Sequence, residues 1–227
     1  MPLVTQRAKL HGQLSRADRS LLSAQVVREI RRAILSGALP PGARVVEAEI
    51  AQQMGISRSP VREAMVQLEH EGLITRHPHR GITVTVLSPE DAAEIAGLRA
   101  HLEAFAYRLA LPALGEPDFT HLETIIGRMV AAGDDLAATI ELDIQFHGFL
   151  VEKSGHQRLG AVYHSLDGLV WALALVARNW GVTARDVPHH HAQLLKAWRT
   201  RDASLAAEAI TQHYRTALGP PSYTDGA

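Results

Sequence analysis

The chain has 227 residues, 46% hydrophobic and 21% charged, so it is long enough for one large globular domain or two modest ones. It lacks cysteine, which excludes disulfides and thiolate metal ligands, and its longest apolar run, Leu169 to Ala177, is far shorter than the roughly 20 residues that span a bilayer. The net charge of −1 is unevenly divided: residues 1–86 hold 12 Lys+Arg and 7 Asp+Glu, a net of +5, and residues 87–227 hold 11 and 17, a net of −6. This division favours a basic domain followed by an acidic one.

The first 20 residues carry scattered charges and no continuous apolar segment. We therefore expect a flexible basic arm rather than a secretory signal, in a cytoplasmic protein with no membrane partner. A helix is predicted from Leu21, because apolar residues then recur at a helical period until Gly37 ends the pattern. The next segment, ALPPGARV, has the proline and glycine of a loop, and a second helix is predicted near Glu47.

Two short helical patterns are joined by Met54-Gly55-Ile56, which is the spacing of a helix-turn-helix. Ser57 is placed to cap the second helix, whose first turns carry Arg58, Ser59 and Arg62 opposite an apolar stripe. Such a helix suits the major groove of DNA, where arginine binds guanine and hydroxyls hold phosphates. Two arginines alone more often mark a solvated helix face, but the order and spacing of the whole segment favour a recognition helix.

The run LITRHPHRGITVTVL, after Gly72, alternates as a β-hairpin does, with turn residues from His77 to Gly81. Gly81 permits an unusual backbone angle, and His79 and Arg80 fall at the tip of the hairpin. A hairpin in this place is a wing that reaches the minor groove or the phosphate backbone. We therefore expect a winged helix-turn-helix domain over residues 21–87.

Residues 24–86 resemble the winged helix-turn-helix of GntR-type bacterial regulators. The segment SRSPVREAMVQLEHEGLI is close to that family's SRTPVREAL-x-x-L-x-x-EGL signature, and the wing glycine follows. The resemblance implies that six residues contact DNA. Bases or phosphates are contacted by Arg58 and Arg62, phosphates by Ser57 and Ser59, and the minor groove by His79 and Gly81. The fatty-acid-responsive members have a further DNA-contacting arginine where this chain has Ala48, so their base preference does not transfer.

The segment Ser88-Pro89-Glu90-Asp91 predicts a helix start, with a capping serine, a proline in the first turn and acids near the positive end of the helix dipole. Helical periodicity continues from there, without an alternating strand pattern. The expected helices are 89–112, 118–133, 135–154, 157–180, 185–201 and 203–218, and residues 219–227 form a tail. Six helices imply an all-α bundle over residues 88–218. The fold class is thus mainly α, with a small β-hairpin wing.

Asp143 and His147 are four residues apart in one predicted helix, so both side chains project from one face and can hold a single cation. His191 and His213 fall in the fifth and sixth predicted helices. One aspartate and three imidazoles form a suitable set for zinc, nickel or manganese, with positions left for water or an anion. Coincidence is the alternative, because the chain has 13 histidines.

Several further patterns are LRAHLEAFAYRLA at 98–110, D-x-x-x-H at 143–147, SG-x-x-x-L at 154–159 and H-x-x-L-L-x-A-x-x-x-x-D at 191–202. Through these, the segment resembles the FCD ligand-sensing domain of the FadR branch of GntR regulators, in its short, six-helix form. The resemblance implies that four residues bind a divalent metal, zinc before nickel or manganese: Asp143, His147, His191 and His213. His189 and His190 adjoin one of these ligands, but the spacing from His191 to Asp202 favours His191.

Arg99 and Glu103 match the R-x-x-x-E pattern of that family. The resemblance implies that Arg99 faces an effector cavity, where a guanidinium pairs well with a carboxylate. An ion pair between the two residues on the helix surface is the alternative. Arg178, with Tyr163 and Trp171 on the same predicted helix, is a further candidate for the cavity, although such aromatic residues are more often ordinary core.

These features predict a homodimeric transcription regulator, with two recognition helices in successive major grooves of a pseudo-palindromic operator, roughly 34 Å apart. We expect repression that is relieved when a small carboxylate binds beside the metal. One alternative is a metal-dependent hydrolase with a DNA-binding head, although no acid or base is clearly paired with the site. Another is a regulator whose metal is purely structural.

Overall fold

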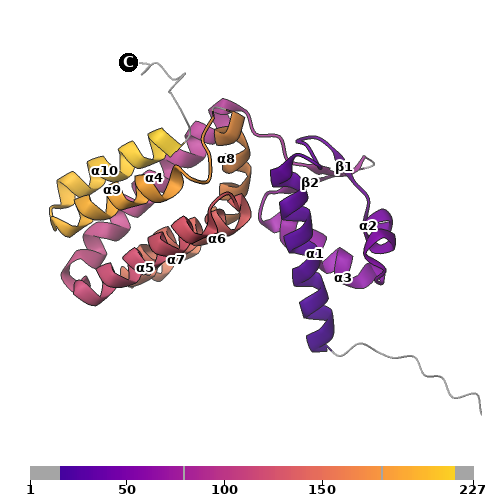
Figure 1. Cartoon of the computed structure of the whole chain (residues 1–227), viewed down its shortest axis with the longest axis horizontal. Coiled ribbons are helices and arrows are strands. Elements are labelled where there is room, and N and C mark those ends of the chain that lie inside the picture. The colour runs from indigo at the N-terminus through magenta and orange to yellow at the C-terminus, as the bar shows by residue number, and fades with distance from the viewer. Residues whose placement is uncertain (1–15, 79, 180, 218–227) are drawn as a thin grey trace, which may run out of the picture.

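A computed structural model describes residues 16–78, 80–179 and 181–217, which form an N-terminal module and a C-terminal helical bundle (Figure 1). The N-terminal module comprises α1 (Arg16–Ser36), β1 (Arg44–Val45), α2 (Glu47–Met54), α3 (Arg58–His70), β2 (Ile74–His77) and β3 (Gly81–Val84). The bundle comprises α4 (Pro89–Ala110), the 3-10 turn η1 (Leu111–Ala113), α5 (Glu116–Ala132), α6 (Leu136–Lys153), α7 (Gln157–His164), α8 (Asp167–Asn179), α9 (Val187–Arg199) and α10 (Ala203–Ala217). The predicted fold class is confirmed.

The wing is an antiparallel hairpin in which Ile74 pairs with Val84 and His77 with Gly81, as the alternating pattern predicted. Gly81 has a φ of 84°, in the left-handed region that favours glycine. The sheet has a third strand, β1, in the order β1-β3-β2. The sequence did not predict β1, because a strand of two residues is too short to show an alternating pattern. Residues 1–15, most of the predicted arm, lie outside the described residues, and α1 begins before the predicted Leu21.

The helix-turn-helix turns at Gly55, which ends α2 with a left-handed φ of 66°. The stripe of α3 that carries Val61, Met65 and Leu68 is fully buried, which confirms the predicted division of this helix. Ser57 occupies the N-cap position of α3 but makes no side-chain capping bond, so that prediction was wrong. Its backbone is extended and the serine is exposed, so water can satisfy the first N–H groups of the helix.

The start of α4 has the predicted capping box, since Ser88 Oγ accepts from the N–H of Asp91 and Asp91 Oδ2 accepts from the N–H of Ser88, both at 3.0 Å. The predicted single helix over 157–180 is instead two helices, α7 and α8, that meet at 43°. The N–H of Leu166 bonds to Tyr163 O and closes α7, and the side chain of Asp167 turns towards Arg99 and His164. The described part of the bundle therefore has seven α-helices, where the periodicity predicted six.

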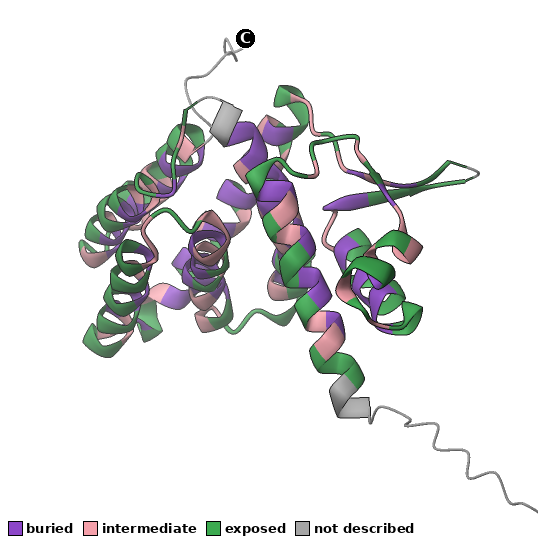
Figure 2. Ribbon diagram, turned by 45° about the vertical axis from the view of Figure 1, so that its right-hand side comes forward, coloured by how far each residue is buried: buried purple, intermediate pink, exposed green. Residues whose placement is uncertain are grey.

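Buried residues lie on the faces where helices meet (Figure 2). One apolar core lies inside the bundle, between α4, α5, α6, α9 and α10. The core of the N-terminal module also contains Ile140 of α6 and Trp171 and Leu175 of α8, so the module packs directly against the bundle. Among the described residues, no single helix has the length and apolar composition of a membrane span, and only the bent pair of α7 and the first part of α8 meets that test jointly.

Candidate functional site

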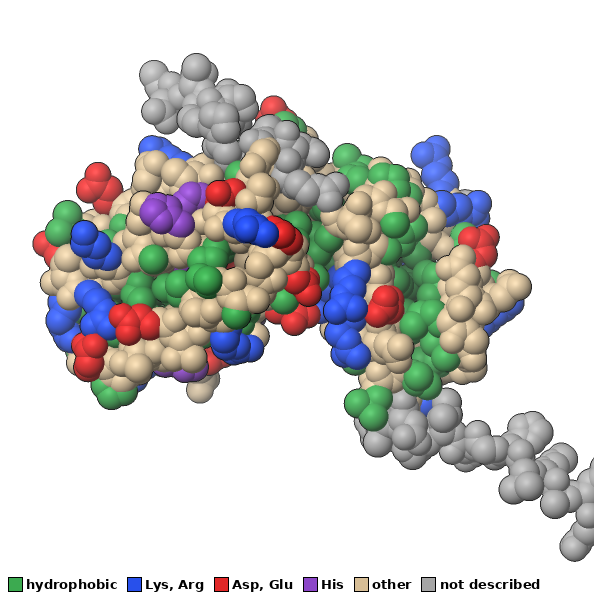
Figure 3. All heavy atoms as spheres, in the orientation of Figure 1, with side chains coloured by type: hydrophobic (Ala, Val, Ile, Leu, Met, Phe, Trp, Pro, Cys, Tyr) green, Lys and Arg blue, Asp and Glu red, His purple; other side chains and the backbone are tan. Residues whose placement is uncertain are grey.

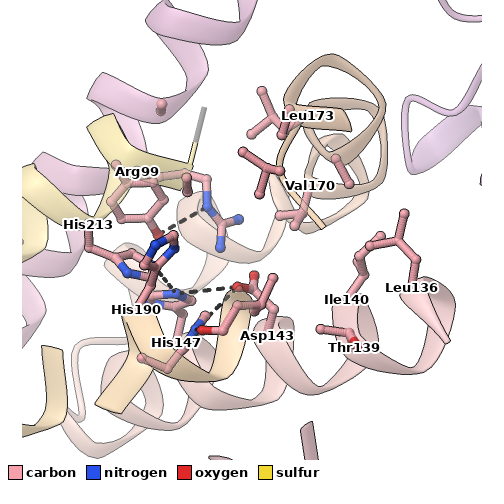
Figure 4. Close-up of a pocket in the computed structure, with 18 of the residues that line it drawn as sticks. Arg99, Leu136, Thr139, Ile140, Asp143, His147, Val170, Leu173, His190 and His213 are labelled. Atoms are coloured by element: carbon pink, nitrogen blue, oxygen red, sulfur yellow. Dashed lines mark hydrogen bonds and ion pairs between the residues drawn. The ribbon is translucent and has the colours of Figure 1, made fainter. Parts of the chain in front are cut away.

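The four residues with metal-ligand spacing converge inside the bundle (Figure 4). Asp143 and His147 lie on α6, His191 on α9 and His213 on α10, and their ligand atoms all lie within 4.8 Å of one another. Asp143 Oδ1 lies 3.0 Å from His191 Nε2 and 3.7 Å from His147 Nε2. The three imidazoles are buried. The structure thus brings these residues together and leaves His189 and His190 outside the cluster.

The protonation pattern of the cluster fits a cation. His191 Nδ1 lies 2.8 Å from Val187 O, and because a carbonyl oxygen can only accept, this nitrogen carries the hydrogen. In neutral His191 the lone pair of Nε2 therefore faces the Asp143 carboxylate, two electron-rich groups that a cation between them would stabilise. His191 Nε2 and His213 Nδ1 are also among the buried side-chain atoms of the described residues that have no hydrogen-bond partner. One carboxylate and three imidazoles are donors that zinc, nickel and manganese accept.

Glu103 is a buried member of the site that sequence reasoning missed. Its Oε1 accepts a hydrogen bond of 2.8 Å from His147 Nδ1, and its Oε2 accepts bonds from the hydroxyls of Tyr163 and Tyr214. The alternative of a surface ion pair between Glu103 and Arg99 was wrong, because both residues are buried and bond to other partners. The spacing of one helical turn from Arg99 could have indicated that both lie on the buried face of α4.

Arg99 lines the cavity beside the cluster and is only 1% exposed. Its Nε donates to Tyr214 Oη, one terminal nitrogen donates to Tyr163 Oη and the other to Asp167 Oδ1. These three bonds hold the guanidinium in place without neutralising it fully, since two of the acceptors are hydroxyls.

Two other candidates for the cavity have different outcomes. The side chain of Arg178 lies outside what the structure describes. Trp171 faces the N-terminal module, where the Arg31 guanidinium lies 4.5 Å from its ring centre, so its predicted place in the cavity was wrong.

The ionisation of the cluster follows from its surroundings. Burial opposes the charge of Asp143, but the charges of His147 and Arg99 nearby outweigh it and hold the pKa of this carboxyl far below its ordinary value. Burial, together with His191 and His147, lowers the pKa of His213 well below its ordinary value, so this imidazole is neutral. For His147, Glu103 and Asp143 overcome the effect of burial and raise the pKa. The site thus offers a carboxylate and a neutral imidazole at physiological pH.

A cavity of about 100 Å³ adjoins the cluster. Its polar side is lined by Arg99, Asp143, His147, His190 and His213. Its apolar side, across the cavity, is lined by Leu136, Ile140, Val170 and Leu173 (Figure 4). A guanidinium, a ligand cluster that can hold a cation, and an apolar wall together suit a small organic anion.

A second candidate site is the exposed face of α3 with the wing. Arg58 and Ser59 are exposed, and the Arg62 side chain is 72% exposed, with its Nε 3.7 Å from a carboxylate oxygen of Glu47. Arginine side chains also gather at the wing end of the N-terminal module (Figure 3). Gly81 is exposed at the start of β3, whereas His79 lies outside the described residues.

Arg76 on β2 is a basic residue of this face that sequence reasoning did not single out. It lies 3.8 Å from Glu47 and 3.1 Å from Glu69. The sequence does not indicate this, because Arg76 joins the face only when the hairpin packs against α2 and α3.

Two family models match the chain. "Bacterial regulatory proteins, gntR family" matches residues 22–84, which hold the helix-turn-helix and the wing. "FCD domain" matches residues 94–216, which hold the metal-ligand cluster and the cavity.

Relatives match over most of the chain. A protein of Paenarthrobacter nicotinovorans, named "Probable D-xylose utilization operon transcriptional repressor", is 30% identical over 216 residues, which cover 93% of each protein. The transcriptional repressor RspR of Escherichia coli (strain K12) is 26% identical over 85% of each protein. The solved structure of E. coli McbR/YncC has a TM-score of 0.65 at 23% identity, over 86% of this chain and 93% of that one, and shows the same fold.

Proposed function

Since the chain belongs to the GntR family of bacterial regulatory proteins and carries an FCD domain, it is a transcription regulator rather than an enzyme, and we propose that it represses its target genes until a small carboxylate binds the bundle. One observation carries the proposal: the side chains of Asp143, three histidines and Arg99 meet at a single cavity within the bundle. A carboxylate entering it would meet the guanidinium and the metal site together.

Asp143, His147, His191 and His213 would hold the divalent metal, zinc before nickel or manganese. When bound, the ion supplies a Lewis-acidic charge with open positions for an anionic ligand. The chain's own contribution is orientation, since Glu103 fixes the ring of His147 and Val187 O fixes that of His191. Arg99 would add a directional contact to the carboxylate.

The DNA-binding surface would be the start of α3 and the wing. Arg58 and Arg62 would contact bases or phosphates, Ser57 and Ser59 phosphates, and Gly81 and His79 the minor groove. We propose a homodimer that works in the cytoplasm, where DNA is accessible, and binds a pseudo-palindromic operator with half-sites one helical turn apart. The effector changes DNA affinity only if it binds one arrangement of the two modules better, by about 1.4 kcal/mol for a tenfold effect.

The test is fluorescence anisotropy with labelled promoter DNA from upstream of the protein's own gene, with and without chelator and a panel of small carboxylates. We expect tight, salt-sensitive binding that Arg58→Ala abolishes and one acid weakens at least tenfold. Arg128→Ala, which removes an exposed arginine of α5 in the bundle, is the matched control and should bind as the unaltered protein does. Absence of specific DNA binding under every condition contradicts the proposal.

The hydrolase alternative is wrong, because both matching families are regulators and Glu103, an acid beside the cluster, orients His147 instead of lining the cavity. A purely structural metal remains the second candidate, favoured by the burial of all three imidazoles. In that case a panel of carboxylates would leave DNA affinity unchanged, and chelation would unfold the bundle.

A further inference from the structure

The cavity beside the metal-ligand cluster has an apolar half. Six aliphatic side chains from α6, α8, α9 and the loop between α8 and α9 form it: Leu136, Ile140, Val170, Leu173, Val182 and Val187. Four of them are labelled in Figure 4, where they lie across the cavity from Arg99, Asp143 and the histidines. A ligand that places its carboxylate at the polar half therefore presents the rest of its body to hydrocarbon.

The two hydroxyl groups in this half are already engaged. Thr139 Oγ1 donates to Asp135 O at 3.0 Å, within the first turn of α6. Thr183 Oγ1 donates to Asp186 Oδ2 at 2.7 Å, and the backbone N–H of Thr183 bonds to the same oxygen at 2.8 Å. The two threonine hydroxyls can therefore only accept further bonds, so the several hydroxyls of a polyhydroxylated ligand would be desolvated against aliphatic carbon with few new partners, which disfavours their binding.

Building on the proposed function, we propose that the effector is a monocarboxylate with a compact aliphatic or aromatic body, and that polyhydroxylated acids are rejected. A cavity of about 100 Å³ sets the size. With roughly 10–15 Å³ of such volume for each water-sized atom, it accommodates on the order of eight non-hydrogen atoms. The polar half provides for the carboxylate and the apolar half selects the body attached to it.

Isothermal titration calorimetry of the zinc-loaded full-length protein with two acids of the same charge and similar size tests this class. Hexanoate has an apolar body, and 2,3,4-trihydroxybutanoate has a hydroxyl on each of three carbons. We expect hexanoate to bind at least tenfold more tightly. Val170→Thr keeps the shape of the side chain but replaces one methyl group with a hydroxyl, and it should weaken hexanoate binding several-fold. Val130→Thr makes the same change at a side chain of α5 that is 64% exposed, and serves as the matched control.

The outcomes separate this inference from the proposed function. If the trihydroxy acid binds as tightly as hexanoate, or if Val170→Thr leaves hexanoate affinity unchanged, the apolar class is wrong while a carboxylate effector stands. If neither acid binds, although promoter DNA does, both the class and the effector part of the proposed function are wrong.

The face of α8 turned away from the cavity contacts the end of the recognition helix, an observation independent of the cavity's composition. Glu71 ends α3, and a Cβ added at Gly168, near the start of α8, would overlap the backbone of Glu71. A Cβ added at Gly72 would lie 2.5 Å from the end of the Leu169 side chain, so the neighbouring pair is also closely packed. Only glycine at 168 permits this approach of two backbones.

Arg31 of α1 joins the same contact. Its terminal nitrogen lies 2.5 Å from Glu71 Oε1, and its guanidinium stacks over the ring of Trp171 on α8 at 4.5 Å. The cavity face of α8 carries Val170 and Leu173, and its first residue, Asp167, accepts a hydrogen bond from Arg99. In Figure 1, α8 lies between the rest of the bundle and the N-terminal module. One helix therefore contacts both the proposed effector and the recognition helix.

We infer, again on the basis of the proposed function, that α8 transmits occupancy of the cavity to α3 through the contact of Gly168 with Glu71. A ligand that displaces Val170 and Leu173 moves the start of α8, and the close backbone contact passes this movement to the end of the recognition helix. The two backbones are packed too closely for one to shift alone, so a movement of either helix displaces the other.

The test measures promoter DNA affinity with and without hexanoate, or whichever acid of the panel binds. Gly168→Ala forces the contact open, so we expect ligand affinity within threefold of the unaltered protein and a ligand effect on DNA binding reduced to less than twofold. Arg31→Gln removes the bridge between Glu71 and Trp171 without inserting an atom, and it tests the same contact should Gly168→Ala fail to fold. Arg32→Gln, at a neighbouring exposed arginine, is the control. A full ligand effect in Gly168→Ala, or in Arg31→Gln, overturns the inference.

Discussion

Glu103 on α4 accepts a hydrogen bond of 2.8 Å from His147 Nδ1 on α6, with both side chains buried. The bond places the hydrogen of His147 on Nδ1 and leaves Nε2 directed at Asp143 and His213. A carboxylate in this position makes the imidazole a stronger metal ligand and fixes the orientation of its ring. The affinity of the cluster for a metal should therefore depend on a residue that is itself no ligand.

Glu103→Gln should lower the affinity for zinc by about tenfold to a hundredfold, the usual cost of losing such an outer partner. The amide oxygen still accepts from His147, but the negative charge is lost, and with it the effect on the imidazole. Competition with a chromophoric chelator measures the dissociation constant. Glu94→Gln changes an exposed acid of the same helix and should leave zinc affinity unchanged. Equal affinities in the two variants would show that Glu103 only fills space.

Removal of the metal should destabilise the protein without unfolding it. The bundle has an apolar core of its own, built on side chains such as Leu122, Met129 and Phe146, which are fully buried and bind no metal. A ligand present at a thousand times its dissociation constant stabilises by about 4 kcal/mol, so chelation should lower Tm by about 10 °C. Thermal melts and far-UV circular dichroism with and without EDTA measure this. Loss of the helical spectrum at 25 °C would instead identify a purely structural metal.

Glu47 should restrain DNA binding, because its carboxylate lies 3.7 Å from Arg62 and 3.8 Å from Arg76 and competes with phosphate for both. Glu47→Gln should bind non-specific DNA about threefold more tightly at low salt. Anisotropy with a duplex of random sequence measures this change. Glu90→Gln, which removes the same charge from the start of α4, is the control. Equal gains in both variants would assign the effect to net charge alone.

Features fixed by neighbouring residues were predicted from the sequence. The hairpin from Ile74 to Val84 and the capping box at Ser88 depend on side chains a few residues apart, so their patterns are visible in the chain. The ligand cluster was also predicted residue by residue, because Asp143 and His147 share one helix face and the resemblance supplied the two distant histidines. The same resemblance implied the cavity and the position of Arg99 beside it.

Features fixed by distant residues were not predicted. Glu103 and Tyr214 bond to each other across 111 positions of the chain, and no local pattern indicates that contact. The break between α7 and α8 was missed because helical periodicity continues through Ser165 and Leu166, whereas the bonds of Asp167 to distant Arg99 and to His164 set the new helix direction. Trp171 was wrongly considered for the cavity for the same reason, since its partner Arg31 lies in the other module.

Asp118 should stabilise the bundle in a way that depends on pH. The hydrogen bond from Lys153 and that from the N–H of Gly115 lower the pKa of Asp118 below its ordinary value. A carboxyl whose pKa is lowered by folding contributes stability above the unfolded pKa, and this contribution is lost as pH falls through the folded pKa. Asp118→Asn should therefore reduce the free energy of unfolding by about 1 kcal/mol at pH 7.

The difference between Asp118→Asn and the unaltered protein should shrink below about pH 4 and vanish once Asp118 is protonated in both states. Urea unfolding followed by circular dichroism at a series of pH values measures it. Glu208→Gln, at an exposed position of α10, should show no such pH dependence. A destabilisation by Asp118→Asn that stays constant down to pH 2.5 would assign the effect to side-chain shape, because charge pairing with Lys153 disappears when the carboxyl is protonated.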